Sequence, residues 1–296
     1  MCWSLKNNTP QLEWKLLKDI TKDDIVVISR TKELFSKESL DLRKYHPKLG
    51  FKNDVELPKK MNNELASLLG ALVSEGSFHN NQILFNNQDK AFYKQIKRMI
   101  LSQFKGIQLY ERNIKGKCME LSIYEQKVVL FLKNIGLESV RSNTKEIPFS
   151  VLMSSKENIK HFLIALFEGD GSVRYKTDKR HNGKSIELNY SSQSKILIEQ
   201  LKVVLLNFGI VTTSPYKDRR KRCYKLTISG YSSVKKFEEE IGFFSKRKKR
   251  IISKIDSINQ NRMSKTDFIP FLNEYLRKKY RTQFVLSLIH ISEPTR

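Results

Sequence analysis

Residues 68–76 read Leu-Leu-Gly-Ala-Leu-Val-Ser-Glu-Gly, and residues 163–171 read Leu-Ile-Ala-Leu-Phe-Glu-Gly-Asp-Gly. Both stretches are apolar runs with small residues that end in a carboxylate followed by glycine. The residues that recur in the same order after each stretch are Gln88, Lys90, Gln95, Lys97 and Cys118, and then Gln193, Lys195, Gln200, Lys202 and Cys223. The chain therefore contains one structural unit twice. We expect a monomer with an internal pseudo-twofold axis, which suits a nearly twofold partner such as double-stranded DNA.

Composition favours the same partner. The 296 residues include 55 Lys and Arg against 31 Asp and Glu, which gives a net charge of +24 and suits a polyanion. A basic ribosomal or chromatin-type protein is the alternative, but 17 Phe and a repeated apolar helix are unusual for that class. Three cysteines without metal-ligand spacing indicate an intracellular protein of the cytoplasm or nucleoid. No apolar run reaches the roughly 18 residues that a membrane span needs.

The pattern of each repeat predicts an α+β fold in which helix, hairpin, helix, hairpin and helix follow one another, αββαββα, twice. Residues 78–86 and 173–190 are predicted strand pairs, the second with a turn at Asn182 and Gly183. Apolar residues at helical spacing follow at 90–104 and 195–208, and further hairpins at 107–123 and 211–228. The expected domains are a β-rich segment at 1–30, a linker at 31–60, repeats at 61–153 and 154–255, an extension at 256–283 and a tail at 284–296, which we interpret as foreign sequence.

The two motif helices are predicted to carry the chemistry. Gly70 and Ser74 lie four residues apart, as do Ala165 and Gly169, so each helix presents small side chains through which the two backbones can approach closely. Each helix ends at a carboxylate, which its dipole opposes by about 0.3 to 1 kcal/mol. The glycine that follows suits a left-handed cap. Two such carboxylates brought together are explained if divalent cations bind there and assist phosphodiester hydrolysis.

At these residues the chain resembles the LAGLIDADG (dodecapeptide, DOD-type) homing endonucleases, specifically the two-motif single-chain type embedded in inteins. The resemblance covers about residues 61–280. It implies a saddle of two antiparallel sheets over DNA, double-strand cleavage at a long asymmetric site, and Mg²⁺, with Mn²⁺ as an alternative. The implied metal site consists of Glu75 and Asp170 with the adjoining Gly76 and Gly171. Glu75 replaces the commoner aspartate but keeps the charge and the oxygen ligands. Glu168 is the second acid of its motif, and we expect no shared catalytic role because its counterpart is Val73.

Two lysines are further catalytic candidates, although most lysines in this chain are expected to be solvated or to touch phosphate. Lys145 lies in Thr-Lys-Glu-Ile-Pro at 144–148, which resembles the family's Lys-x-Ile-Pro block, where the lysine lies near the metal site. Its counterpart is expected in Ser-Lys-Arg-Lys-Lys-Arg at 245–250. We favour Lys248, with Lys246 and Lys249 as alternatives.

DNA contacts are expected from the hairpins, because a two-stranded ribbon fits the major groove. Arg suits guanine, Asn and Gln suit adenine, and Lys mostly contacts phosphate. The candidates are Asn81, Gln82, Asn86, Gln88, Arg112 and Lys117 in the first repeat, and Arg174, Lys176, Lys179, Arg180, Asn189, Lys217, Arg219, Arg220 and Arg222 in the second.

The N-terminal segment resembles part of an intein splicing domain, in which a tryptophan-containing strand leads through Gly-Asp into a valine-rich strand. Here the Gly-Asp is Asp23-Asp24. Splicing needs an N-terminal Cys or Ser with a Thr-x-x-His block and a terminal His-Asn. Cys2 follows Met1 without that block, and His290 is not followed by asparagine. We expect this polypeptide not to splice.

Three functions are therefore considered. The sequence favours a site-specific double-strand DNA endonuclease that is a fragment of an intein. The alternatives are a DNA- or RNA-binding or maturase-like module without cleavage, and protein splicing by a longer form of the chain. The presence of both motif carboxylates favours the endonuclease.

Overall fold

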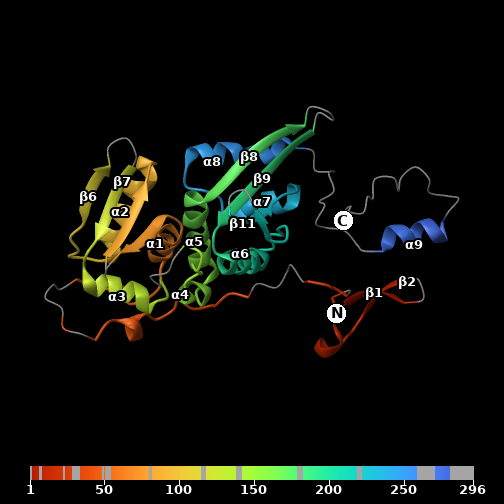
Figure 1. Cartoon of the computed structure of the whole chain (residues 1–296), viewed down its shortest axis with the longest axis horizontal. Coiled ribbons are helices and arrows are strands. Elements are labelled where there is room, and N and C mark those ends of the chain that lie inside the picture. Colours follow the sequence, from red (N-terminus) through yellow and green to blue (C-terminus); the bar gives the residue numbers. More distant parts are fainter. Residues whose placement is uncertain are drawn as a thin grey trace. The chain divides into compact units, whose positions relative to one another are not determined.

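The computed structural model describes residues 2–6, 9–22, 24–28, 34–48, 50, 55–79, 82–114, 118–137, 142–178, 183–218, 222–258 and 271–280. The chain divides into two compact units, and Figure 1 labels most of their helices and strands. Unit 1 consists of Met1–Lys32 and Met263–Arg296, and unit 2 of Glu33–Arg262. The predicted tail at 284–296 lies outside the described residues.

Unit 1 contains a small antiparallel sheet in the order β2-β1-β3. Its elements are β1 (Cys2–Lys6), β2 (Thr9–Glu13), η1 (Leu17–Asp19), β3 (Ile25–Val26) and α9 (Leu272–Lys279). Helix α9 contacts β2. Asp24 fixes the turn before β3, because its carboxylate accepts a hydrogen bond from the Thr21 amide at 2.8 Å and pairs with Lys15 at 2.5 Å.

Unit 2 contains the two repeats, and the predicted αββαββα order is confirmed in both. The first repeat consists of α1 (Asn63–Glu75), β4 (Gly76–His79), β5 (Gln82–Asn87), α2 (Lys90–Gln103), β6 (Tyr110–Ile114), β7 (Cys118–Ile123) and α3 (Gln126–Asn134). The second consists of α5 (Lys156–Gly169), β8 (Gly171–Asp178), β9 (Gly183–Ser192), α6 (Lys195–Asn207), β10 (Tyr216–Asp218), β11 (Cys223–Ile228) and α7 (Tyr231–Glu240). The remaining elements are η2 (Arg43–Tyr45), α4 (Phe149–Leu152), α8 (Lys246–Ile252) and η3 (Ser253–Ser257).

Each repeat forms a four-stranded antiparallel sheet, in the order β4-β5-β7-β6 in the first and β10-β11-β9-β8 in the second. Alternate residues of the strands face the core, as Ile83 and Phe85 do in β5 and Ile186 and Leu188 do in β9. Helices α2 and α3 contact the first sheet, and α6 and α7 contact the second. Each sheet therefore has one face that packs on helices and one opposite face that carries polar side chains.

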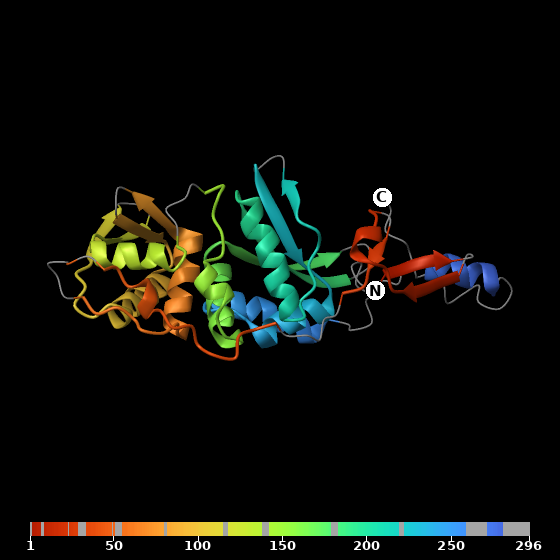
Figure 2. The ribbon, with the colours of Figure 1, turned by 90° about the horizontal axis from the view of Figure 1, so that it is seen from below.

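Helices α1 and α5 lie side by side between the two sheets (Figures 1 and 2). Residues 65–74 of α1 are all buried, as expected for a central helix that is apolar on every side. Asn62 caps α1 by accepting a hydrogen bond from the Leu65 amide at 2.9 Å, and Ser155 caps α5 in the same way from the Asn158 amide. Both central helices thus begin at a defined residue. Their lengths then determine where their C-terminal ends lie.

The small residues lie where the two helices approach most closely. A Cβ atom placed on Gly70 would lie 2.3 Å from the Phe162 carbonyl oxygen and 3.1 Å from the Ala165 Cβ. A Cβ atom on Gly169 would lie 2.3 Å from the Ser74 Oγ. No side chain fits at either glycine without moving the helices apart, so these residues set the distance between the two repeats.

Gly76 and Gly171 do not adopt the left-handed conformation that we expected after each helix. Gly76 has φ −81° and ψ 150°, which is extended backbone. The two glycines are needed for space instead, because a Cβ on Gly76 would lie 2.3 Å from the Leu72 carbonyl oxygen, and one on Gly171 would lie 2.4 Å from that of Phe167. In each repeat the chain therefore turns directly from the motif helix into the first strand of the sheet.

The described residues between 34 and 60, within the predicted linker, belong to unit 2. Leu42, Val55 and Leu57 are buried in its core. Phe35 packs on Phe208 with the ring centroids 4.9 Å apart. This stretch is therefore part of the body of unit 2. Within the described part of the whole chain, no helix is both long and apolar enough to cross a membrane.

Candidate active site

The two motif carboxylates lie at the C-terminal ends of the packed central helices. Glu75 is the last residue of α1, and Asp170 caps the end of α5. A Cβ atom on Gly169 would lie 3.1 Å from Glu75 Cγ, so Glu75 lies against the end of the other motif helix. The structure thus brings the two predicted acidic residues to the point where the helices converge.

Each carboxylate has one weak neutral hydrogen-bond donor beside it. Asn87 Nδ2 donates to Glu75 Oε1 at 3.4 Å, and Tyr190 Oη donates to Asp170 Oδ2 at 3.4 Å. Burial raises the pKa of Glu75, an effect that Lys145 and Lys248 oppose. Burial and the nearby Glu75 charge raise the pKa of Asp170 to about 6. Both shifts mean that negative charge is costly here until a cation compensates for it.

Lys145 reaches the end of the first motif helix. Its Nζ donates to the Val73 carbonyl oxygen at 2.7 Å and to that of Ser74 at 3.2 Å. These carbonyls belong to the last turn of α1, which has no intrahelical donors for them. Burial lowers the pKa of Lys145, and the charges of Asp170 and Glu75 oppose this change. Lys145 therefore caps α1 while it lies within electrostatic reach of both acidic residues.

Lys248 holds the matching place on the second motif helix. Its Nζ donates to the carbonyl oxygens of Phe167 at 2.9 Å, Glu168 at 2.6 Å and Gly171 at 2.9 Å. Glu168 occupies the position in its motif that Val73 occupies in the first, so the two lysines share one equivalent carbonyl, that of Val73 in α1 and that of Glu168 in α5. Lys246 and Lys249, the two alternatives, are exposed, whereas Lys248 is buried. The structure thus distinguishes Lys248 from Lys246 and Lys249 by its position, and its catalytic role stays a prediction.

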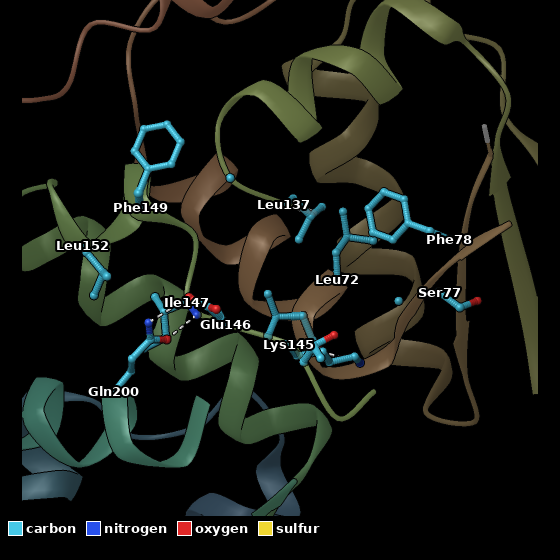
Figure 3. A pocket seen from close by; sticks show the side chains of 14 residues that line it. Leu72, Ser77, Phe78, Leu137, Lys145, Glu146, Ile147, Phe149, Leu152 and Gln200 are labelled. Atoms are coloured by element: carbon cyan, nitrogen blue, oxygen red, sulfur yellow. Dashed lines mark hydrogen bonds between the residues drawn. The ribbon is translucent and has the colours of Figure 1, made fainter. Parts of the chain in front are cut away.

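The segment that carries Lys145 is held by helix α6 of the other repeat. Ser194 Oγ donates to the Lys145 carbonyl oxygen at 2.6 Å, and the Ile147 amide donates to Gln200 Oε1 at 2.8 Å. Figure 3 shows Gln200 beside Ile147 and Glu146, at the edge of a cavity of about 260 Å³. Leu72, Phe78 and other apolar side chains line this cavity behind Lys145.

Several predicted DNA contacts of the first repeat lie on the sheet face opposite the buried residues. On β5, Gln82 and Asn86 alternate with the buried Ile83 and Phe85. Arg112 on β6 is exposed and pairs across the sheet with Glu120, which in turn pairs with Asn86. Gln88 follows β5 and lines the same cavity as Glu75. Asn81 and Lys117 lie outside the described residues.

In the second repeat, Arg174, Lys176 and Asn189 lie on the corresponding face. Lys176 pairs with Glu187 at 2.5 Å, and Asn189 Oδ1 accepts a hydrogen bond from Thr227 Oγ1 at 2.8 Å. The exposed Arg222 lies in a turn directly before β11. Lys179, Arg180, Arg219 and Arg220 lie outside the described residues.

Lys217 lies on the other face from the rest of the second-repeat candidates. It pairs across β10 and β11 with Tyr224, and its Nζ lies 5.9 Å from the centroid of that ring. Tyr224 packs against the core on the same face as Leu226. Lys217 is therefore not retained among the residues proposed to contact DNA.

Sequence reasoning missed three residues near the carboxylates, namely Asn87, Tyr190 and Arg247. Asn87 and Tyr190 occupy strand positions of the buried parity, in line with Phe85 and Leu188. In each strand a polar residue continues a row of buried residues at every second position. This departure from the apolar pattern was the signal from which these two residues could have been predicted. Arg247 is exposed and lines the cavity that contains Glu75 and Lys248. Nothing in the basic run at 246–250 distinguishes it by sequence.

The residues present fit a hard divalent cation. Glu75 and Asp170 supply the carboxylate oxygens that Mg²⁺ prefers, and Mg²⁺ commonly binds through one or two protein carboxylates together with phosphate and water. Asn86 Oδ1 lines the same cavity as Glu75 and is buried without a hydrogen-bond partner among the described residues. The described residues contain no group of three or more His, Cys, Asp and Glu side chains that would enclose a metal by themselves.

Asp170→Asn should raise the free energy of unfolding of the metal-free protein at pH 7.5. The folded state raises the pKa of Asp170 from 3.8 to about 6, so folding takes up a proton between these values. The carboxyl therefore costs nothing below about pH 4, and stability is lost as the pH rises through about 6. The variant should therefore gain stability only above about pH 4, where the parent carboxyl begins to ionise.

Urea unfolding in EDTA between roughly pH 4 and 8 measures this difference. The parent and the variant should be equally stable near pH 4 and should diverge as the pH rises. Equal stability across the whole range would contradict the raised pKa of Asp170.

Comparison with known proteins finds a family match within the second repeat. Residues 157–242 match the LAGLIDADG-like domain model. The chain is 30% identical over 206 residues to the replication factor C small subunit of Methanocaldococcus jannaschii, covering 68% of this chain and 10% of that protein. It is 24% identical over 291 residues to a DNA gyrase subunit of Mycobacterium kansasii, covering 96% of this chain and 48% of that protein. The chain thus spans less than half the length of these two curated relatives.

Among solved structures, I-DmoI in complex with DNA and Mn aligns with a TM-score of 0.44 and 18% identity. That alignment covers 61% of this chain and 96% of the I-DmoI chain.

Proposed function

Because the chain has a LAGLIDADG-type fold, we propose that it is a site-specific endonuclease that cuts both strands of duplex DNA. The observation that carries this proposal is the pair of carboxylates at the ends of the two packed helices, each helix end being capped by a lysine. An acid of raised pKa beside a second acid is costly for a purely structural protein. Such a pair is useful where divalent cations and phosphate supply the compensating charges.

In this proposal Glu75 and Asp170 hold Mg²⁺, or Mn²⁺ in its place, and the backbones of Gly76 and Gly171 let the chain turn away directly beside them. The bound ion would polarise the phosphate and stabilise the negative charge that develops during hydrolysis. Lys145 and Lys248 place an ammonium group at each helix end, where it stabilises charge on a phosphate oxygen or donates a proton to the leaving oxygen. Burial lowers the pKa of both lysines, which favours proton donation.

The polar faces of the two sheets are proposed to contact the DNA. Arg112 in the first repeat and Arg174 in the second lie exposed on these faces and match guanine or phosphate. Gln82, Asn86 and Asn189 match adenine in the same way. The opposite faces are covered by helices and buried apolar residues, so they cannot serve this purpose.

We further propose that the chain derives from an intein. The two relatives above are, by their names, a replication factor subunit and a gyrase subunit, and this chain matches only part of each. A region shared by proteins of such different names is typical of a module inserted into host proteins. The sheet of unit 1 would then belong to a splicing domain.

A selection experiment tests the endonuclease proposal and identifies the target sequence at the same time. Duplexes from a randomised library are bound in Ca²⁺, recovered, and then incubated with the protein in Mg²⁺. The proposal expects one family of sequences, cut on both strands at fixed positions. Bound sequences that remain intact in Mg²⁺ and Mn²⁺ would contradict cleavage and would favour the binding or maturase-like alternative.

Binding should weaken steeply as salt rises. The net charge of +24 is large enough to neutralise many phosphates. If six or more phosphates are contacted, affinity for the selected duplex should fall by about 10³-fold or more between roughly 50 and 200 mM salt. Fluorescence anisotropy of the labelled duplex in Ca²⁺ measures this dependence. An affinity that hardly changes with salt would show that the basic surface serves another partner.

A further inference from the structure

Glu168 is a buried acid that the proposed reaction does not use. It lies near the end of α5, two residues before Asp170, and 5% of its side chain is exposed. Its Oε2 accepts hydrogen bonds from the Phe244 amide at 2.9 Å and the Ser245 amide at 3.1 Å. Its Oε1 lies 3.7 Å from Lys248 Nζ. One carboxylate thus connects α5 with the segment that precedes α8 and with the lysine that α8 carries.

These contacts determine where α8 begins. Ser245 is the N-cap of α8, and its Oγ accepts a hydrogen bond from the Lys248 amide at 3.4 Å. Glu168 holds the Ser245 amide and Ser245 holds the first turn, so the backbone of Lys248 is fixed relative to α5. The lysine then reaches back to three carbonyl oxygens around the end of α5. Removal of one partner of such a buried charged pair is strongly destabilising, because the other charge is left without compensation.

The first motif helix carries an apolar residue in place of this carboxylate. Val73 occupies the matching position and lines the apolar cavity behind Lys145 that Figure 3 shows. The backbone of the Lys145 segment is held instead by the other repeat, where Ser194 Oγ donates to the Lys145 carbonyl oxygen and Gln200 Oε1 accepts from the Ile147 amide. The two lysines therefore cap the two motif helices at matching places, but different residues hold them there. Lys248 is held by an acid of the motif helix that it caps, and Lys145 caps a helix that has valine at that position.

We propose that Glu168 is a positioning residue, which fixes the first turn of α8 so that Lys248 stays on the C-terminal carbonyls of α5. Lys145 does not depend on it. The structural part of this proposal stands on the contacts above, and its consequence for DNA cleavage rests on the proposed function. Loss of Glu168 should then release Lys248 alone and impair one half of the active site.

Lysine reactivity tests the positioning role without metal or DNA. The protein is treated with a trace of an acetylating N-hydroxysuccinimide ester at neutral pH, and the rate at each lysine is read by peptide mass spectrometry. In the parent, the exposed Lys246 and Lys249 should react fast and Lys248 slowly. Glu168→Val, which installs the residue of the first motif, should speed Lys248 by about tenfold or more, as expected for loss of hydrogen bonds to a charged group.

The same experiment contains its controls. Lys145 should keep its parental rate in Glu168→Val, and Lys246 and Lys249 report reagent activity on the same helix. Glu168→Gln, which keeps an acceptor oxygen, should restore most of the protection of Lys248 and serves if the valine variant does not fold. Glu240→Gln removes a carboxylate that pairs with Lys156 outside the site, and it should change neither lysine. Continued protection of Lys248 in both Glu168 variants, or equal exposure of Lys145, would overturn the proposal.

Strand-resolved cleavage tests the functional consequence. A supercoiled plasmid that carries the selected target is cut in Mg²⁺ by the parent and by Glu168→Val. The variant should accumulate nicked circles cut always on the same strand, with unchanged affinity in Ca²⁺, and Glu168→Gln should restore linear product. Equal slowing of both strands would overturn the separate roles of the two lysines. A parent that cuts no DNA at all would refute the endonuclease proposal while leaving the acetylation result to decide the role of Glu168.

Discussion

Asp170→Asn and Glu75→Gln should each bind the selected duplex in Ca²⁺ as the parent does and should each lose cleavage in Mg²⁺ by roughly two to three orders of magnitude or more. Both substitutions nearly keep the side-chain volume but remove the charge that is proposed to bind the cation. The Glu75 charge raises the pKa of Asp170, so the two carboxylates are close enough for each to support cation binding by the other in the proposed site. Loss of either should therefore impair cutting of both strands. Single-turnover cleavage of the labelled duplex measures the rate on each strand.

A matched control separates the loss of a proposed metal ligand from the loss of a negative charge elsewhere on the protein. Glu187→Gln removes one negative charge from the polar face of the second sheet, where Glu187 pairs with Lys176. This variant should cut at nearly the parental rate and bind slightly more tightly, because it removes repulsion from phosphate. If Asp170→Asn and Glu75→Gln both cut as fast as Glu187→Gln, the assignment of the two acids is wrong.

Gly70→Leu should destabilise unit 2 by about 3 kcal/mol or more, as overpacking of a close helix contact does. Even a Cβ atom at this position would lie 2.3 Å from the Phe162 carbonyl oxygen, and backbone cannot yield as a flexible side chain can. The two central helices would have to separate. Gly70 lies on the same helix as Glu75, a little more than one turn before it. Separation of the two helices should therefore also move Glu75 away from Asp170 and reduce cleavage. Urea unfolding followed by circular dichroism measures the stability.

Gly50→Leu is the matched control for this substitution. A Cβ atom on Gly50 would meet nothing within 4 Å, so the same change in side chain should cost little there. Unfolding of Gly70→Leu at the same urea concentration as Gly50→Leu would show that the helix contact is not tight. Gly169→Leu should behave like Gly70→Leu, since its Cβ would lie 2.3 Å from Ser74 Oγ.

The repeated motif allowed the architecture and the paired acids to be predicted, because spacing and small residues constrain how two apolar helices can pack. The reason for Gly76 and Gly171 was not predictable in the same way. A glycine after a helix is compatible with a left-handed cap and with a direct turn into a strand, and only the tertiary path of the chain decides between them.

The lysines show a similar limit. Lys145 and Lys248 were predicted by resemblance, but their hydrogen bonds to helix carbonyls depend on where distant segments return. Lys217 was assigned to the DNA-facing surface, and its place on the other face follows from the register of the three-residue strand β10 with β11. A shift of one residue changes the face of a strand, and a run of consecutive charges carries no alternation that reveals the register. Glu168 likewise acquires a partner only when the segment at 244–248 folds back onto α5.

If Glu75 and Asp170 together hold the catalytic cation, Mn²⁺ should bind between them, and its anomalous scattering locates it directly. Crystals of the protein bound to its selected duplex, grown with Mn²⁺, give an anomalous signal wherever the ion binds. We predict a peak in contact with the carboxylates of both Glu75 and Asp170 and with DNA phosphate, and its loss in Asp170→Asn. A peak bound by other residues, in a complex that still cuts its DNA, would contradict the assignment of these two acids as the metal ligands.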